Sequence, residues 1–446
     1  MSKIAPAQLT QSRVLKIAVP IVLSNATVPI LGAVDTGVVG QMGLAAPIGA
    51  VGIGAIVLSA IYWIFGFLRM GTTGLVAQAR GAGDEGESGA LLMRALMIGL
   101  AAGVVFVVMQ RVLFWGAFAM APASQEVETL ARDYMRIRIW GAPSTIALYA
   151  VTGWLIATER TRGVLILQLW MNSLNILLDL WFVLGLGWGV EGVAIATLIA
   201  EWTGLGLGLW LCRSAFGGDQ WKDWERIFNR IKIKRMMAVN RDILIRSVVM
   251  QVSFLSFMFL GAGFGDVTLA ANQVNLQFLE ITAYALDGFA FSAEALVGAA
   301  LGARNRGELR RAVIITSKWG FWMAIPIAVF FFLAGPWMID LMATSQEVRA
   351  EARAYLFWVA IAPVVGIASW MLDGIFIGAT RTRDMRNAMI LSVLVYILAV
   401  LVLIGPYENH GLWLSLMIFN TTRAITLGWF YPALEASADT PQVAAQ

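Results

Sequence analysis

Long apolar stretches follow one another along the whole chain, and each is bounded by charged residues or by glycine and proline. A membrane-spanning helix needs roughly 20 mostly apolar residues. With 59% hydrophobic and 13% charged residues, against about 25% charged in soluble domains, the sequence predicts an all-α membrane protein. About twelve spans are expected, at residues 14–39, 47–79, 90–112, 127–157, 163–185, 190–213, 241–264, 268–301, 312–334, 346–379, 386–405 and 411–432.

Lysine and arginine are concentrated in alternate loops between these spans. The basic loops read QARGAGDEGE, ATERTRG, WKDWERIFNRIKIKR, GARNRGELRR and ATRTRDMR, whereas the intervening loops MGLAAPIG and GLGWGVEG have almost no basic residues. Because basic loops stay on the cytoplasmic side of a membrane, both chain termini are expected to be cytoplasmic. The placement of the basic residues at helix ends argues against a nucleic-acid partner.

The two halves of the sequence repeat each other at a constant offset of 221 residues. Three loop segments match in this way, LVAQARGAGDEGE at 75 with LVGAALGARNRGE at 296, SQEVETLARDY at 124 with SQEVRAEARAY at 345, and RTR at 160 with RTR at 381. Each half holds six spans, so both enter the membrane from the same side, as in a parallel repeat whose halves can rock to give alternating access. The sequence therefore predicts two pseudo-symmetric six-helix lobes, an N-lobe at 1–214 and a C-lobe at 241–446, joined by a cytoplasmic linker at 215–240.

Polar side chains interrupt the spans of the first half at similar depths. Asp35 lies about five residues from the outer end of its span, Asp179 about six, Thr197 about seven and Tyr134 about eight, which places all four roughly 8 to 12 Å below the outer surface. Asn175 lies four residues before Asp179, on the same helix face. A carboxylate inside a membrane is costly and marks a functional site by default, so one shared site is predicted. The alternatives are packing for Thr197 and Tyr134, and structural carboxylic acids for the two aspartates.

Several separated motifs resemble those of the MATE (multidrug and toxic compound extrusion) transporters, in particular their DinF-type branch. They are the acidic residue of the first span, NILLD in the fifth, the RGAGDEGE and ERTRG loops, NRDILIR opening the seventh and AFSAEALVGAALG ending the eighth. The resemblance implies cation-coupled efflux of amphipathic organic cations across the inner membrane of a prokaryote. It also implies an N-lobe network for proton coupling or cation binding, and a first-helix bend at Pro20. The matching network positions are Asp35, Tyr134, Asn175, Asp179 and Thr197.

Two further charges of the first half, Arg69 and Glu201, fall near the bilayer midplane when residues are counted from the span ends. An unpaired charge there would be costly. A buried ion pair between the two is therefore predicted, either as an architectural contact or as the latch of a gate.

In the second half, Glu280, Asp287 and Glu294 follow at intervals of seven residues, so they line one face of a helix. Together with Asp373 they are expected to form an acidic wall of the substrate cavity, to which Gln251 also contributes. The alternative for Glu294 is that it faces cytoplasmic water. Other MATE branches carry a cation-site glutamate in the seventh helix, whereas the segment VVMQVSF here offers only Gln251 nearby, which argues against a sodium site in this half.

The leading functional hypothesis is a secondary antiporter that exports hydrophobic or cationic compounds in exchange for H⁺, with Na⁺ at Asp35, Asn175, Asp179 and Thr197 as the alternative ion. A flippase for lipid-linked precursors is the second hypothesis, and it would need cationic residues in its cavity. An enzyme has little support, because G-x-S-x-G, H-E-x-x-H and P-loop patterns are absent. The single Cys212 and the single His410 support neither a disulfide nor a Cys/His metal site. No cofactor and a monomer in the lipid bilayer are expected.

Overall fold

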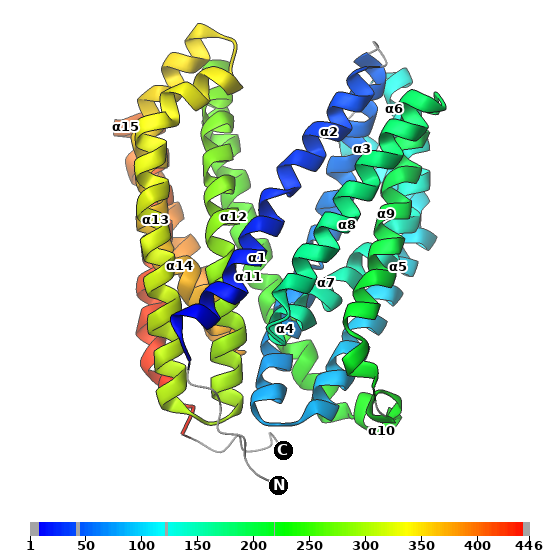
Figure 1. The fold of residues 1–446 in the computed structure, drawn as a ribbon. Coiled ribbons are helices and arrows are strands. Elements are labelled where there is room, and N and C mark those ends of the chain that lie inside the picture. Colours follow the sequence, from blue (N-terminus) through cyan, green and yellow to red (C-terminus); the bar gives the residue numbers. More distant parts are fainter. Residues whose placement is uncertain (1–8, 42–44, 121–123, 218, 440–446) are drawn as a thin grey trace. The chain divides into compact units, whose positions relative to one another are not determined.

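The computed structural model describes residues 9–41, 45–120, 124–217 and 219–439, and all regular structure in this part of the chain is helical (Figure 1). The helices in the first half are α1 (Gln11–Ala26), α2 (Val28–Gly40), α3 (Ala45–Trp63), α4 (Gly66–Gly81), α5 (Glu85–Met120), α6 (Gln125–Arg138), η1 (Ile139–Gly141), α7 (Ala142–Ala157), α8 (Thr161–Asp179), η2 (Leu180–Gly185) and α9 (Gly189–Leu211). The remaining helices are η3 (Arg213–Phe216), η4 (Asp219–Lys222), α10 (Trp224–Ile227), α11 (Arg230–Ala262), α12 (Asp266–Gly302), α13 (Arg306–Met342), α14 (Gln346–Gly378) and α15 (Thr382–Ala436).

Ten helical segments of the described residues are long and apolar enough to cross a membrane. The first predicted span is divided into α1 and α2 at Thr27, so neither piece reaches that length alone. In α15, Glu408 has non-helical dihedral angles (φ 49°, ψ −128°), which separate two spans inside one 55-residue segment. These two features account for the difference from the predicted twelve, and the all-α fold is confirmed.

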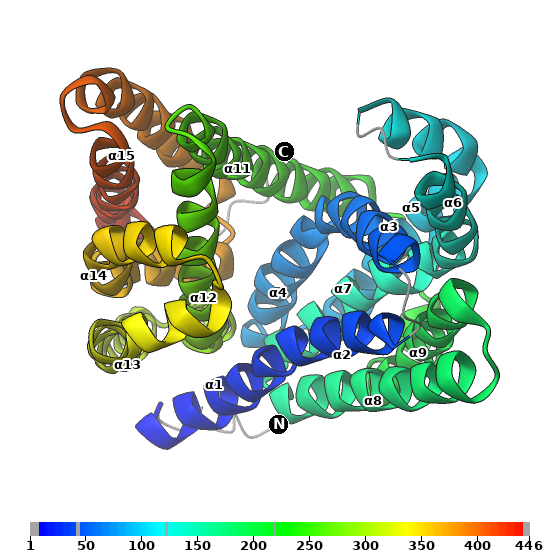
Figure 2. The ribbon, with the colours of Figure 1, turned by 90° about the horizontal axis from the view of Figure 1, so that it is seen from above.

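The chain forms two compact units. Unit 2 consists of Leu23–Val76 and Asp84–Ile233, and unit 1 of Met1–Val22, Ala77–Gly83 and Lys234–Gln446. In unit 2, α8 packs against α9, and α5 packs against α7. In unit 1, α12, α13 and α14 pack against one another, and α14 packs against α15 (Figure 2).

The 221-residue repeat is present in the backbone as well as in the sequence. Left-handed residues, which commonly end helices, occur as pairs at this offset. The φ values are 59° at Glu159 and 51° at Thr380, 76° at Gly83 and 54° at Arg304, and 71° at Gly187 and 49° at Glu408. The hydroxyls of Ser124 and Ser345 cap α6 and α14 in the same way, each accepting a hydrogen bond from the backbone N–H three residues on.

Equivalent glycines allow equivalent helix crossings in the two units. A Cβ atom on Gly153 would lie 2.6 Å from the Arg69 carbonyl oxygen in unit 2, and one on Gly374 would lie 2.5 Å from the Ala290 carbonyl oxygen in unit 1. Both pairs differ by 221 residues, so the contact is the same in each repeat. Only glycine lets the two backbones approach this closely.

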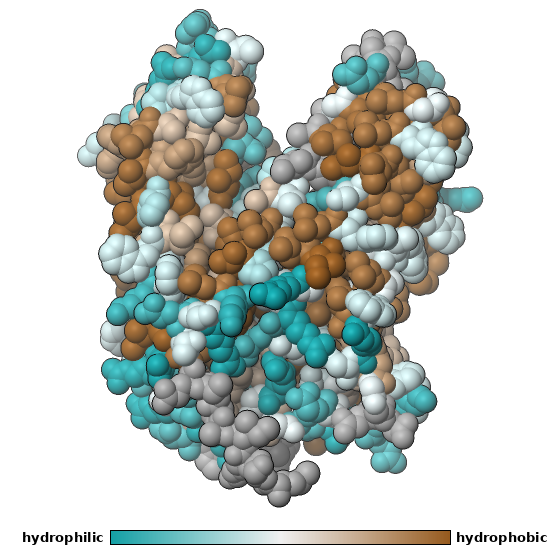
Figure 3. Space-filling model, in the orientation of Figure 1, coloured by the Kyte–Doolittle hydropathy of each residue, from teal (hydrophilic) through white to brown (hydrophobic). Residues whose placement is uncertain are grey.

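Large apolar side chains cover much of the outer surface of both units. In unit 2, Leu177 projects from the end of α8 and Leu180 and Trp181 project from η2, and in unit 1 Phe332 and Leu333 project from α13. Figure 3 shows the hydrophobic surface over α8 and α9. Exposed apolar area of this extent would be unfavourable in water, so these faces contact lipid.

Candidate functional site

The helix α8 in unit 2 carries a row of polar side chains along one face. Gln168, Asn172, Asn175 and Asp179 follow at spacings of four, three and four residues, which brings successive members together on a helix. Gln168 Nε2 donates to Asn172 Oδ1 at 3.0 Å. All of these residues except Gln168 are buried, so the row faces the interior of the unit.

The predicted residues Asn175 and Thr197 meet directly. Asn175 Nδ2 donates to Thr197 Oγ1 at 3.0 Å, and that hydroxyl donates to the Val193 carbonyl at 2.9 Å. Asp179 lies one turn further along α8 and is completely buried. The chain then passes into a π-helical turn, η2, an irregularity that is common at functional sites.

The helix α2, which contains Asp35, packs against α8, α9 and η2 in the same unit. Asp35 is in the eighth position of this helix, but its side chain lies outside the part of the chain that the structure describes. Asn172 Nδ2 donates to Thr27 Oγ1 at 2.8 Å and so holds the break before α2 against α8. The helix that carries Asp35 is therefore fixed beside the residues with which Asp35 was predicted to act.

Tyr134 is buried in α6, where its ring packs on Gly54 of α3. One turn later on the same helix, Arg138 Nη1 contacts Glu201 Oε2 at 2.7 Å. Glu201 in turn lies one turn after Thr197 on α9. The helices α6 and α7 form one span, and α9 forms another. A single span, which begins with α8 and runs the opposite way, lies between them in the sequence, so the α6–α7 span and α9 run in the same direction. Tyr134 and Thr197 therefore lie at the same level, one turn from the ion pair.

This ion pair corrects the predicted pairing of Glu201 with Arg69. Depth counting placed Arg69 and Glu201 at one level, but it gave no information on which helix faces which. Arg138, at the end of α6, reaches Glu201 because α6 packs against α9. Arg69 lies half-buried on α4, and its carbonyl accepts the Thr73 hydroxyl at 2.9 Å. Arg138 could have been noticed from the sequence, because it lies inside the predicted span 127–157.

The predicted acidic wall of unit 1 is wrong for Asp373. Its carboxylate is buried and is held by both Arg246 of α11 and Arg423 of α15. All three side chains are at least nine-tenths buried, so the cluster carries one excess positive charge. Neither arginine was predicted, although Arg423 lies twelve residues into the span predicted at 411–432.

The other predicted residues of unit 1 lie in different environments. Glu280 and Gln251 are exposed and Asp287 is half-buried, whereas Glu294 is almost completely buried. The water-facing alternative for Glu294 is therefore wrong.

The predicted bend at Pro20 does not coincide with a break in the helix. α1 continues through Pro20 and ends at Ala26, and the backbone leaves the helix at Thr27, whose hydroxyl donates to the Ser24 carbonyl at 2.7 Å. Among the described residues, groups of three or more His, Cys, Asp or Glu side chains that could hold a metal ion are absent.

Comparison with known proteins places the chain in one family. The MatE family model matches twice, at residues 20–181 and 243–402, once in each repeat. The chain is 37% identical over 418 residues to the DNA damage-inducible protein F of Escherichia coli K12, a match that covers 92% of this chain and 90% of that protein. It is 25% identical to a probable multidrug resistance protein NorM of Synechocystis, over 93% of each chain.

Solved structures show the same fold. The structure of the Vibrio cholerae MATE transporter VcmN in the bent form superposes with a TM-score of 0.88 and 19% identity, over 96% of this chain and 98% of that one. A MOP superfamily transporter from Pyrococcus furiosus superposes with a TM-score of 0.83. The chain thus belongs to the MatE family, whose members are membrane transporters and not enzymes.

Proposed function

We propose that this transporter exports amphipathic, mainly cationic compounds in exchange for protons, and that Asp35 and Asp179 carry the coupling protons. The observation that carries the proposal is the complete burial of Asp179 at the end of a polar row that includes the Asn175–Thr197 contact. A second carboxylate on the adjacent α2 raises the cost of ionising both, which favours a bound proton near neutral pH. We further propose that both termini lie in the cytoplasm and that transport occurs across the inner membrane.

In this mechanism the site takes up H⁺ when it faces outward, and the loss of negative charge releases a cationic compound. A proton that moves down about one pH unit and 100 mV supplies roughly 1.4 plus 2.3 kcal/mol. That energy is enough for several-hundredfold accumulation of a neutral compound at one-to-one coupling. A monovalent cation would be accumulated only about tenfold, because its own export against the membrane potential uses the electrical part of that energy.

Purified protein in liposomes, with proton and sodium gradients imposed separately, tests the proposal. Asp35→Asn and Asp179→Asn should each reach the membrane, because an amide resembles the protonated acid, but should lose transport driven by a proton gradient. Glu191→Gln, which changes an exposed acid of α9, is the matched control and should transport normally. Uphill transport by Asp179→Asn at the wild-type rate contradicts the role of Asp179, and transport driven only by the sodium gradient replaces H⁺ with Na⁺.

A flippase for lipid-linked precursors remains the second candidate, because Arg246 and Arg423 give unit 1 the buried positive charge that such a substrate would need. Translocation of a fluorescent polyprenyl pyrophosphate in the same liposomes, and its loss in Arg423→Met, would favour this function over drug export.

A further inference from the structure

The short helix α10 in unit 2 exposes two large aromatic side chains beside each other. Trp224 is 55% exposed and Phe228 is 53% exposed, and their rings stack with centroids 5.9 Å apart. The next large apolar residue, Ile231 in the first turn of α11, is 61% exposed. Ile227, by contrast, is completely buried. We call Trp224, Phe228 and Ile231 the linker face, because they lie in the segment that joins the two repeats.

The depth of the linker face is set by the contacts of α10 with α5 (Figure 1). Arg226 Nη1 contacts Asp84 Oδ1 at 2.6 Å, and Arg94 Nε donates to the Ile227 carbonyl at 2.7 Å. The candidate membrane span of α5 begins at Glu85, and Arg94 lies roughly 14 Å further along the helix. α10 therefore lies beside the first turns of a span, which places the linker face at the boundary between lipid and water.

The end of α9 gives the same depth independently. Trp210 is the penultimate residue of this membrane span and is 58% exposed. The Arg213 guanidinium lies over its ring, 4.2 Å from the centroid. The Lys222 ammonium lies 5.0 Å from the centroid of the Trp221 ring. Aromatic rings beside basic side chains are typical of the membrane–water interface, where the ring contacts lipid and the charge contacts headgroups.

The protein itself does not neutralise the charge around the linker face. Three exposed basic residues nearby form no ion pair with another described residue, namely Arg213, Lys222 and Arg230. Glu225 is an exposed acid among them, whereas Asp223 already caps α10 and contacts Arg226. The exposed side chains described in this segment therefore carry more positive than negative charge.

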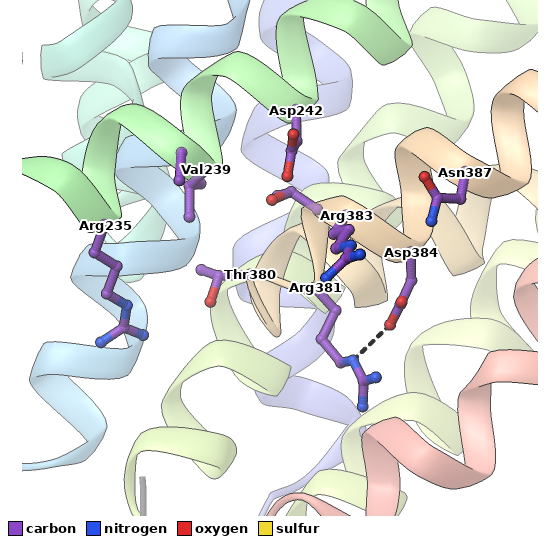
Figure 4. Close-up of a pocket in the computed structure, with 10 residues that line it drawn as sticks. Arg235, Val239, Asp242, Thr380, Arg381, Arg383, Asp384 and Asn387 are labelled. Carbon is purple, nitrogen blue, oxygen red and sulfur yellow. Dashed lines mark ion pairs between the residues drawn. The ribbon is translucent and has the colours of Figure 1, made fainter. Parts of the chain in front are cut away.

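The basic loop between α14 and α15 in unit 1 lacks this combination. It borders a pocket of about 620 Å³ beside the beginning of α11, as Figure 4 shows. Arg381 Nε contacts Asp384 Oδ2 there at 2.7 Å, and the described residues that line the pocket include no aromatic side chain. Exposed aromatic rings together with free basic side chains are therefore not a general property of the basic loops.

We propose that the linker face binds the surface of an anionic lipid leaflet. Trp224, Phe228 and Ile231 would enter the boundary between headgroups and acyl chains, and the three basic residues would contact lipid phosphates. An apolar surface of this kind is unfavourable in water, and its continuity with the span that ends at Trp210 favours a membrane over another protein. The proposal is independent of the coupled ion and of the exported compound.

A spin label on the linker face measures its position in the bilayer. The chain has a single cysteine, so Cys212→Ser provides a background in which Phe228→Cys can be labelled in the full-length protein. The protein is placed in nanodiscs of phosphatidylcholine, with or without phosphatidylglycerol. The label should collide more often with O₂, which partitions into lipid, than with a water-soluble nickel chelate, and phosphatidylglycerol should increase this preference. A label at Glu347→Cys, exposed at the start of α14, is the aqueous reference.

Charge variants in the same labelled background test the contact with lipid phosphates. Lys222→Gln and Arg230→Gln should each raise the phosphatidylglycerol fraction needed for half of the change about fivefold. Arg111→Gln is the matched control, because it removes an exposed charge near the other end of α5, and it should leave that fraction unchanged.

The proposal is overturned if the label at position 228 prefers the nickel chelate in both lipids, because the linker face then lies in water. It is also overturned if the label is shielded from both reagents, since another protein surface then covers it, or if phosphatidylglycerol has no effect. Wild-type behaviour of Lys222→Gln and Arg230→Gln, or an equal loss in Arg111→Gln, overturns it as well.

Discussion

The buried pair Arg138–Glu201 shows how a single contact can hold the candidate site in place. It joins α6 to α9 one turn from Tyr134 and Thr197, and both side chains are almost completely buried. Ion pairs of this kind add little net stability, but the loss of one partner leaves an uncompensated charge.

Arg138→Met is therefore expected to destabilise the protein by about 3 to 5 kcal/mol, whereas Arg138→Met combined with Glu201→Gln should recover most of the loss. The exposed pair Asp133–Arg136 on the same helix is the control, and Arg136→Met should cost no more than about 1 kcal/mol. Thermal unfolding of the purified variants measures the difference. Equal stability of Arg138→Met and Arg136→Met would mean that the pair does not hold α6 against α9.

At the scale of elements, the predicted linker is partly a continuation of a helix. α11 begins at Arg230, so the second half of the region predicted at 215–240 is helical. The first half of this linker region ends in α10, which is docked on the start of α5 in unit 2. Arg226 Nη1 contacts Asp84 Oδ1 at 2.6 Å, and Arg94 Nε donates to the Ile227 carbonyl at 2.7 Å.

This docking is expected to weaken in acid. Burial raises the pKa of Asp84, but the Glu87 backbone N–H and Arg226 outweigh it and lower that pKa below its usual value of 3.8. A carboxylate with a lowered pKa contributes stability above pH 3.8, and the contribution is lost as the pH falls through the lower value. The protection of the α10 amides against hydrogen exchange, measured relative to their intrinsic exchange rates at each pH, should therefore fall below about pH 4. Asp84→Asn should show low protection of the α10 amides at every pH, and Glu225→Gln, which changes an exposed neighbour, should behave like the wild type.

At the scale of the whole molecule, the orientation in the membrane rests on the alternating basic loops. Reporter fusions at position 225 should be cytoplasmic, and fusions at position 187, between η2 and α9, should be on the opposite side. If position 225 proves to be outside, the proposed orientation is wrong.

The number of spans and the repeat were determined by the sequence alone, because both depend on local properties. Lipid requires that each apolar segment satisfy its own backbone as a helix, and the matching segments at an offset of 221 residues need no knowledge of packing. Depth in the membrane could also be counted along each helix. This is why Asn175, Asp179 and Thr197 were predicted to belong together, and the contact between Asn175 and Thr197 agrees with that prediction.

Only the tertiary structure decided which side chains face each other across helices. Depth counting cannot tell which neighbour a helix packs against, so Glu201 was assigned to Arg69 although α6 brings Arg138 to it. For the same reason Asp373 was assigned to an acidic wall, although α11 and α15 bring two arginines to its carboxylate.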